Sequence, residues 1–229
     1  MQKTVDFYFN IFKKKGLFKL FTGLEKDLSS QYNKLINNKL SSNINLIEEF
    51  YLNVFTGINN ESYDISWSIP KAEKLIKDNK ISSVDINISH LYSDVNNLEQ
   101  QKLQHYQNID VDLFEPIIVS YYEPIKKLIV IDGNHRVYWS NVKGKKNIKA
   151  FILSPFSNPE IMNEKNFQLY VFHHNLVNLI NLCCNPLDWK FEANKSLNWN
   201  TYYGDVKFKN LFFNKLKMII KKPYLPKAK

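Results

Sequence analysis

The pattern of apolar and polar positions changes character about a third of the way along the chain. Over most of residues 1–60, apolar side chains recur at helical spacings, which predicts helices. Gly16 is expected to divide the first helical stretch into two pieces. Thr22 is a candidate cap for the next helix, with Glu25 three residues later as in a capping box. Residues 44–55 predict a further helix.

From about residue 81 to residue 154 the pattern favours a β-α-β-β-α-β order, which follows a loop and a short helix. Residues 59–64 predict a loop, and residues 70–79 a short helix with Pro70 at its first position, where the missing N–H costs nothing. The expected strands cover residues 82–92, 115–122, 126–132 and 147–153, and the expected helices cover residues 93–108 and a segment from Asn134, with Gly144 just beyond its end.

The later part of the chain again favours helices. Residues 160–185 predict one or two helices, and residues 206–222 predict the last one. The predicted fold class is therefore α+β, with a small mixed β-sheet flanked by N- and C-terminal helices. We expect a helical extension over 1–79, a core over 80–154 and a mostly helical extension over 155–229, packed as one domain.

The chain is basic but contains a single arginine. Its 31 Lys and Arg residues exceed 22 Asp and Glu residues, giving a net charge of +9. Such a charge favours anionic partners: nucleic acid, an anionic membrane surface or a phosphorylated ligand. Arg136 is the only arginine. Because arginine is the residue suited to bidentate contacts with guanine, sequence-specific DNA recognition is not favoured.

The N-terminal helices admit two interpretations. Their apolar residues alternate with Lys13, Lys14, Lys15 and Lys19, which could serve a membrane surface or a partner. The favoured alternative is that the aromatic face packs on the domain while the lysines are solvated. The N-terminal segment lacks a clean signal pattern, and no apolar run is long enough to suggest a transmembrane helix.

The cysteines and histidines give little sign of a metal site. Cys183 and Cys184 are adjacent, and neighbouring cysteines rarely form an unstrained disulfide, so we expect a reducing, cytoplasmic setting. The pairs Cys183–Cys184 and His173–His174 invite a zinc interpretation. Adjacent residues on a helix point about 100° apart, so neither pair chelates well, and we expect no metal held by them.

The most informative stretch is IVIDGNHRVYWSNVKG, residues 129–144. An apolar strand meets Asp132 and Gly133, and a helix follows at once. The first turn of a helix carries unpaired N–H groups and partial positive charge, and a glycine before it lets an anion approach closely. Gly133, Asn134, His135 and Arg136 are therefore candidate phosphate-binding residues.

The side chains around this turn suggest further roles. Arg136 would add a fixed double donor to the anion, and His135 could donate when protonated. Asp132 can orient Mg²⁺ or accept a proton. The simpler alternative is that Asp132-Gly133 is only a turn, Asn134 a helix cap and His135 a surface residue.

The segments SSVDINISHLY, EPIIVSYY and LIVIDGNHRVYWSNVKGKKNIKAFIL resemble the ParB/sulfiredoxin superfamily, over roughly residues 80–154. Its members share a glycine-x-x-arginine phosphate-binding turn, here Gly133 to Arg136. The resemblance implies a bound nucleotide. Sulfiredoxins carry a reactive cysteine where this chain has Asn134, and partitioning members use several arginines and a helix-turn-helix domain. Free-serine kinases of this fold have an Asp-Gly-x-x-Arg turn, which resembles Asp132, Gly133 and Arg136 of this chain.

The leading hypothesis is therefore an NTP-dependent phosphotransferase or NTPase that uses Mg²⁺ with ATP or CTP. In it Asp132 and His135 are the candidate catalytic residues, and a small hydroxyl compound could be the acceptor. The free-serine kinases also use an upstream glutamate as base; the candidates here are Asp85, Asp94, Asp112 and Glu115. The alternatives are a nucleic-acid-binding protein or nuclease of the same fold, and a non-catalytic interaction module.

Overall fold

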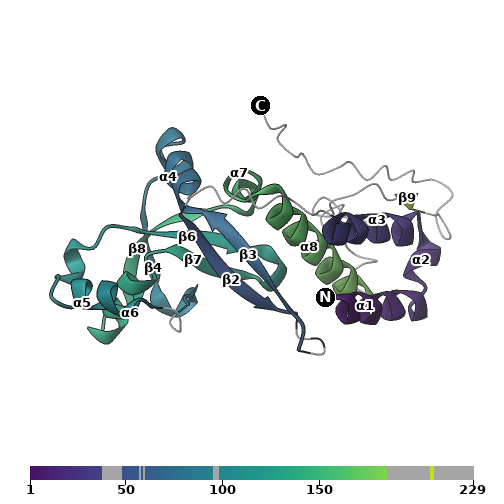
Figure 1. The fold of residues 1–229 in the computed structure, drawn as a ribbon, viewed down its shortest axis with the longest axis horizontal. Helices are drawn as coiled ribbons and strands as arrows, with labels where there is room; N and C mark the ends of the chain where they lie inside the picture. The colour runs from purple at the N-terminus through teal and green to yellow at the C-terminus, as the bar shows by residue number, and fades with distance from the viewer. Residues whose placement is uncertain (38–47, 57, 59, 95–97, 185–206, 209–229) are drawn as a thin grey trace. The chain divides into compact units, whose positions relative to one another are not determined.

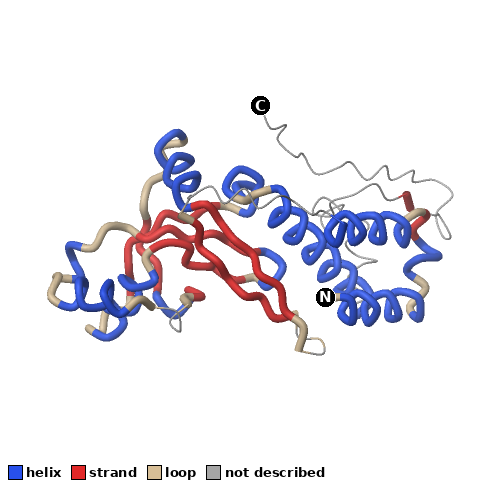
Figure 2. Tube along the Cα trace, in the orientation of Figure 1, coloured by secondary structure: helices blue, strands red, loops and turns tan. Residues whose placement is uncertain are grey.

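The computed structural model describes residues 1–37, 48–56, 58, 60–94, 98–184 and 207–208 (Figures 1 and 2). They group into two compact units. The helical unit comprises the described residues within 1–41, 53–63 and 165–229. The sheet unit comprises those within 42–52 and 64–164.

Four helices dominate the helical unit. They are α1 (Gln2–Lys14), α2 (Leu17–Leu20), α3 (Leu24–Asn37) and α8 (Glu164–Cys184), and a short strand β1 (Phe21–Thr22) pairs antiparallel with β9 (Lys207–Phe208). As predicted, Gly16 separates the first two helices, at a φ of 73°. Of the last helix predicted, over residues 206–222, residues 206 and 209–222 lie outside the described residues, and Lys207–Phe208 is a strand.

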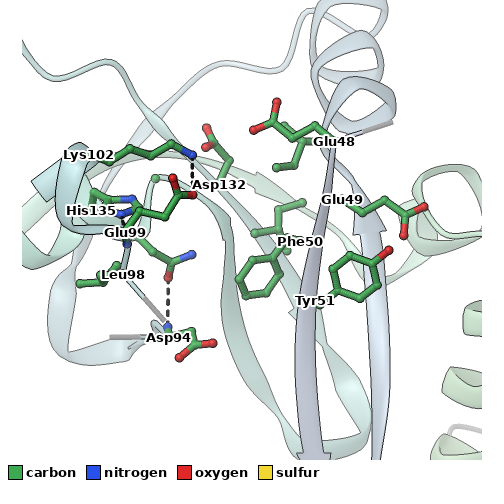
Figure 3. Close-up of a pocket in the computed structure, with 14 residues that line it drawn as sticks. Glu48, Glu49, Phe50, Tyr51, Asp94, Leu98, Glu99, Lys102, Asp132 and His135 are labelled. Carbon is green, nitrogen blue, oxygen red and sulfur yellow. Dashed lines mark hydrogen bonds and ion pairs between the residues drawn. The ribbon is translucent and has the colours of Figure 1, made fainter. Parts of the chain in front are cut away.

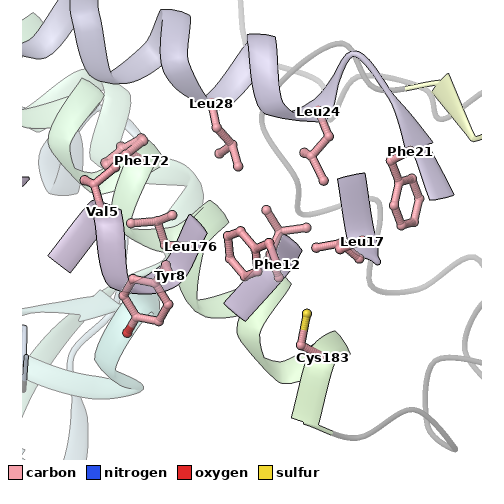
Figure 4. Close-up of a cluster of buried hydrophobic side chains, with 11 residues drawn as sticks. Val5, Tyr8, Phe12, Leu17, Phe21, Leu24, Leu28, Phe172, Leu176 and Cys183 are labelled. Atoms are coloured by element: carbon pink, nitrogen blue, oxygen red, sulfur yellow. The ribbon is translucent and has the colours of Figure 1, made fainter. Parts of the chain in front are cut away.

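The core of the helical unit is aromatic and aliphatic (Figure 4). Val5, Tyr8 and Phe12 recur every three or four residues on α1, so they share one buried face. Phe12 is completely buried and meets Phe18 edge to face, with ring centroids 5.8 Å apart. Leu176 of α8 belongs to the same cluster. This packing agrees with the favoured interpretation of the N-terminal helices.

The helix predicted over residues 44–55 is wrong for the part that the structure describes. Strand β2 (Glu49–Phe55) pairs with β3 (Ser62–Ser68), and the two units share the residues of this pair. Phe50, Leu52 and Val54 alternate with polar or exposed positions, and that period of two defines a strand. The loop predicted over 59–64 is correspondingly too long, because β3 already begins at Ser62.

A mixed five-stranded sheet forms the centre of the sheet unit. Its order is β4-β8-β6-β7-β5, with bounds Val84–Asn87 (β4), Asn147–Leu153 (β8), Ile117–Tyr122 (β6), Lys127–Asp132 (β7) and Leu91–Tyr92 (β5). Strand β6 runs antiparallel to β7 and parallel to β8. Its residues Ile117 and Val119 are completely buried. The predicted α+β class with a small mixed sheet is confirmed at this level.

Helices of the sheet unit follow the predicted order. They are α4 (Ile69–Asp78), α5 (Gln100–Gln107), α6 (Asn134–Val142) and α7 (Asn158–Ile161). Pro70 lies in the first turn of α4, and the Ser68 side chain caps this helix by accepting from the N–H of Lys71. Gly144 lies just beyond α6 with a φ of 75°, as expected for a residue ending a helix. Of the helices that the structure describes, none has the length and apolar character needed to cross a membrane.

Candidate functional site

The turn between β7 and α6 has the predicted strand-glycine-helix geometry. Gly133 adopts a φ of 96°, a region that side chains rarely tolerate. A Cβ at this position would lie 2.5 Å from Cγ2 of the buried Ile117. Both the backbone angle and the space therefore require glycine. Helix α6 begins at Asn134, so its first backbone N–H groups have no partner within the helix.

The side chain of Asn134 links this turn by hydrogen bonds to the residues that follow β5. Its Oδ1 accepts from the Ser93 hydroxyl at 2.8 Å and from the Asp94 backbone N–H at 3.0 Å. Its Nδ2 donates to the Val130 carbonyl at 3.1 Å. The side chain is thus used within the protein, and the contribution of Asn134 to anion binding would come from its backbone.

Arg136 lies inside the sheet unit, with only 7% of its surface exposed. Its Nη1 donates to the carbonyls of Glu115 and Pro116 at 2.9 and 3.1 Å, and its Nη2 pairs with Oδ2 of Asp132 at 2.5 Å. Nε is buried and has no partner among the described residues. The guanidinium therefore joins the start of β6 to the end of β7 and fixes the Asp132 carboxylate.

His135 connects the turn to α5. Its Nε2 accepts from the backbone N–H of Glu99 at 2.9 Å, so the neutral ring carries its proton on Nδ1. The ring stacks on Tyr106 with centroids 6.4 Å apart. Burial, and then the charge of Lys102, lower the pKa of His135 from its ordinary value. The neutral ring can donate through Nδ1 but has no second acceptor nitrogen to offer.

A pocket of about 550 Å³ opens beside the turn (Figure 3). Asp132, Gly133, Asn134 and His135 line one side of it. The rest of the lining comes from the start of α5 with its preceding residues, from the beginning of β2 with its preceding residue, and from three single residues of other segments. These residues are Leu98, Glu99, Lys102, Glu48, Glu49, Phe50, Tyr51, Ile69, Asp94 and Ile131. The structure thus brings together four of the five residues predicted for the site, and Arg136 supports them from outside the lining.

The pocket lining that the structure describes combines an ammonium group with several carboxylates. Lys102 pairs with Oε1 of Glu99 at 2.8 Å, and this hydrogen bond raises the pKa of Lys102. Glu49 accepts from the Ser66 hydroxyl at 2.8 Å. Glu48, Asp94 and Asp132 are the remaining acids of the lining. A cation and a helix start beside carboxylates can hold a phosphate group and accept a proton within one cavity.

The four acids upstream of the turn that were candidates for the general base lie in different surroundings. Asp94 lines the pocket. Asp85 is paired with Lys149 across β4 and β8, and Asp112 forms an ion pair with Lys145 at 2.7 Å. Glu115 serves through its carbonyl, as an acceptor for Arg136. Only Asp94 of these four is therefore placed to contact a ligand in this pocket.

Sequence reasoning missed Glu48, Phe50 and Lys102. The alternation of apolar residues along β2 was a usable signal for a strand there. Lys102, in contrast, is one of many lysines and carried no local signal, because it approaches the turn only through the packing of α5 on α6.

The histidine pair of α8 lies in the helical unit and is engaged with neighbouring polar groups. Nδ1 of His173 is hydrogen-bonded to the Tyr63 hydroxyl, and Nε2 of His174 to the Asn178 amide. Within the part of the chain that the structure describes, no three His, Cys, Asp or Glu side chains are grouped to hold a metal ion. Cys184 belongs to α8, but its side chain lies outside the described part.

Comparison with known proteins adds no relative to this description: no family model, curated protein or solved structure matches the chain.

Proposed function

We propose that the pocket binds a nucleoside polyphosphate, such as ATP or CTP, and transfers its terminal phosphoryl group to water or to a small hydroxyl compound. One observation carries the proposal: the glycine turn selected from sequence as a phosphate site lines a cavity that Lys102 and several carboxylates also line. Its size is within the range typical of small-molecule sites.

The phosphate end of the ligand would lie against the start of α6. Backbone N–H groups of the first turn and the partial positive charge of the helix favour an anion there. Among the described residues of the lining, Lys102 supplies the only ammonium group. Arg136 would act indirectly in this arrangement, because its Nη groups are bonded to Glu115, Pro116 and Asp132.

The carboxylates suit the chemical step. The attacking oxygen forms a bond to the terminal phosphorus, the bond from that phosphorus to the bridging oxygen breaks, and the attacking group releases its proton to a carboxylate. Asp132, which directly precedes the turn and is 33% exposed, is the candidate acceptor. The donor set also fits Mg²⁺, which typically needs only one or two carboxylates beside phosphate oxygens and would neutralise developing charge. Asp132 would hold the ion only in place of accepting the proton, and Asp94, which also lines the pocket, would then be the acceptor.

Calorimetric titration with ATP and CTP in the presence of Mg²⁺ tests the proposal. Wild type is compared with Lys102→Met, which removes the ammonium group from an exposed side chain and spares the buried Arg136. We expect the loss of this charged contact to weaken binding by about tenfold. Lys74→Met is the matched control, because Lys74 is 79% exposed on α4 and lies outside the pocket lining.

The results separate three cases. Nucleotide binding that Lys102→Met weakens and Lys74→Met does not would support the site, and phosphate release by the wild type would establish turnover. Binding without release or transfer of phosphate would indicate a nucleotide-binding module without catalysis. No binding of either nucleotide at millimolar concentration would contradict the proposal.

A further inference from the structure

The two sides of the pocket differ in chemistry. The turn and α5 present Lys102, Asp132 and His135, whereas β2 presents the ring of Phe50 (Figure 3). Phe50 and Tyr51 project to opposite sides of the strand, as successive residues do, and it is Phe50 that faces the turn (Figure 3). Ile69 and Ile131 add to the apolar part of the lining. The cavity therefore offers an aromatic ring across from the turn, with the carboxylates of Glu48 and Glu49 on the same side as that ring.

The Phe50 ring is in contact with a fully buried side chain. Trp67 packs against it with ring centroids 6.1 Å apart and an interplanar angle of 33°. Trp67 has no exposed surface, and its indole N–H donates to Oδ1 of Asn158 at 3.2 Å. Because the indole is fixed by packing and by this hydrogen bond, it restricts the orientation of the Phe50 ring. Phe50 itself is half-buried and lines the pocket, so part of it is accessible to a ligand.

We infer that Phe50 is the residue on which the base of the bound nucleotide stacks. The inference rests on the proposed function, and it assigns the two ends of the ligand: phosphates on the α6 start and Lys102, base on β2. A flat aromatic ring half-open to a cavity is suited to a nucleobase, because every base offers a π face. This contact favours nucleotides over inorganic polyphosphates and discriminates little between ATP and CTP.

The test compares ligands with and without a base. Titrations of ATP, CTP and inorganic tripolyphosphate, each with Mg²⁺, are run on wild type, Phe50→Leu and Phe50→Tyr. Loss of the ring should weaken both nucleotides by about tenfold, since stacking is typically worth that much per base. Tripolyphosphate should bind Phe50→Leu as it binds wild type, and Phe50→Tyr, which keeps the ring, should retain nucleotide affinity. Phe156→Leu is the matched control, because Phe156 is 69% exposed in the same unit and outside the lining.

Each other result has a definite meaning. Equal weakening of tripolyphosphate and nucleotides in Phe50→Leu would show that the ring only shapes the pocket, and would overturn the inference. Unchanged nucleotide binding in Phe50→Leu, with binding still dependent on Lys102, would overturn the stacking role and leave the proposed function standing. If wild type bound neither the nucleotides nor tripolyphosphate, the result would contradict both the proposed function and the stacking role of Phe50.

Discussion

The helical unit and the sheet unit both bury neutral polar side chains, but among the described residues the sheet unit also buries a permanently charged one. In the helical unit, α8 buries His173 and His174 beside Asn175, all of them groups that can be neutral. The sheet unit buries neutral groups such as Asn158 and, in addition, the permanently charged Arg136, with a carboxylate and two carbonyls as its acceptors. Neutral polar groups need hydrogen bonds when buried, whereas a charge also needs a counter-charge.

This difference has functional meaning. The charge in the sheet unit lies behind the candidate phosphate turn and fixes Asp132, a residue that lines the pocket. The imidazoles of the helical unit line no part of that pocket. We therefore expect the stability of the sheet unit to depend on the ion pair between Arg136 and Asp132. The stability of the helical unit should instead depend on pH.

The largest expected effect is that of Arg136→Ala. The substitution leaves the Asp132 carboxylate and the carbonyls of Glu115 and Pro116 without their donor. Removal of one partner of a buried pair typically costs about 3–5 kcal/mol in the free energy of unfolding, measurable by urea denaturation. Lys74→Ala, at an exposed ion pair, should change stability by less than about 0.5 kcal/mol. A loss in Arg136→Ala no larger than in this control would contradict the structural role of Arg136.

The second prediction concerns acid and the helical unit. Burial, and then the neighbouring His174, lower the pKa of His173 to about 4. Above pH 6.5 the imidazole of His173 is neutral in both folded and unfolded chains, so it does not reduce the free energy of unfolding. As the pH falls below 6.5 the unfolded chain takes up the proton first, so stability is lost progressively until about pH 4. At pH 5 the loss should reach about 2 kcal/mol.

Hydrogen exchange of the α8 amides at pH 7 and pH 5 measures this loss where it arises. His173→Gln should remove most of the added opening at pH 5, because glutamine cannot titrate. His90→Gln, at an exposed histidine of the sheet unit, should leave the pH response unchanged. A wild-type response that His173→Gln retains would assign the acid sensitivity to other groups.

The sequence was most informative where local chemistry decides structure. Asp132-Gly133 followed by a polar-apolar helix pattern predicted the turn, its glycine and the following helix, and all three are confirmed. The helix predicted over residues 44–55 is a strand from Glu49 to Phe55, where Phe50, Leu52 and Val54 alternate with polar or exposed positions. Short apolar runs are ambiguous in this way, and pairing with β3 settles the outcome.

The contacts that the site residues make with distant segments could not be predicted from the local sequence. Arg136 bonds to backbone carbonyls about 20 residues earlier, and a carbonyl leaves no trace in residue type. Lys102 and Phe50 come to the pocket from α5 and β2, through packing that no single segment encodes. The sequence therefore predicted the turn, whereas the walls of the pocket required the three-dimensional structure.

The smallest expected effect is a difference in stability between alanine variants of the two glycines at the ends of α6. Gly133 and Gly144 both have positive φ, so alanine is strained at either position, by about 1 kcal/mol. A Cβ at Gly144 would meet nothing within 4 Å, whereas one at Gly133 would press on Ile117 and on Nε of Arg136, 2.9 Å away. Gly133→Ala should therefore be less stable than Gly144→Ala by about 1 kcal/mol or more in urea denaturation. It should also weaken nucleotide binding, because the displaced groups support the phosphate turn, whereas Gly144→Ala should bind as wild type does. Equal stability of the two variants would mean that the space behind the turn can relax, and that Arg136 does not hold it rigidly.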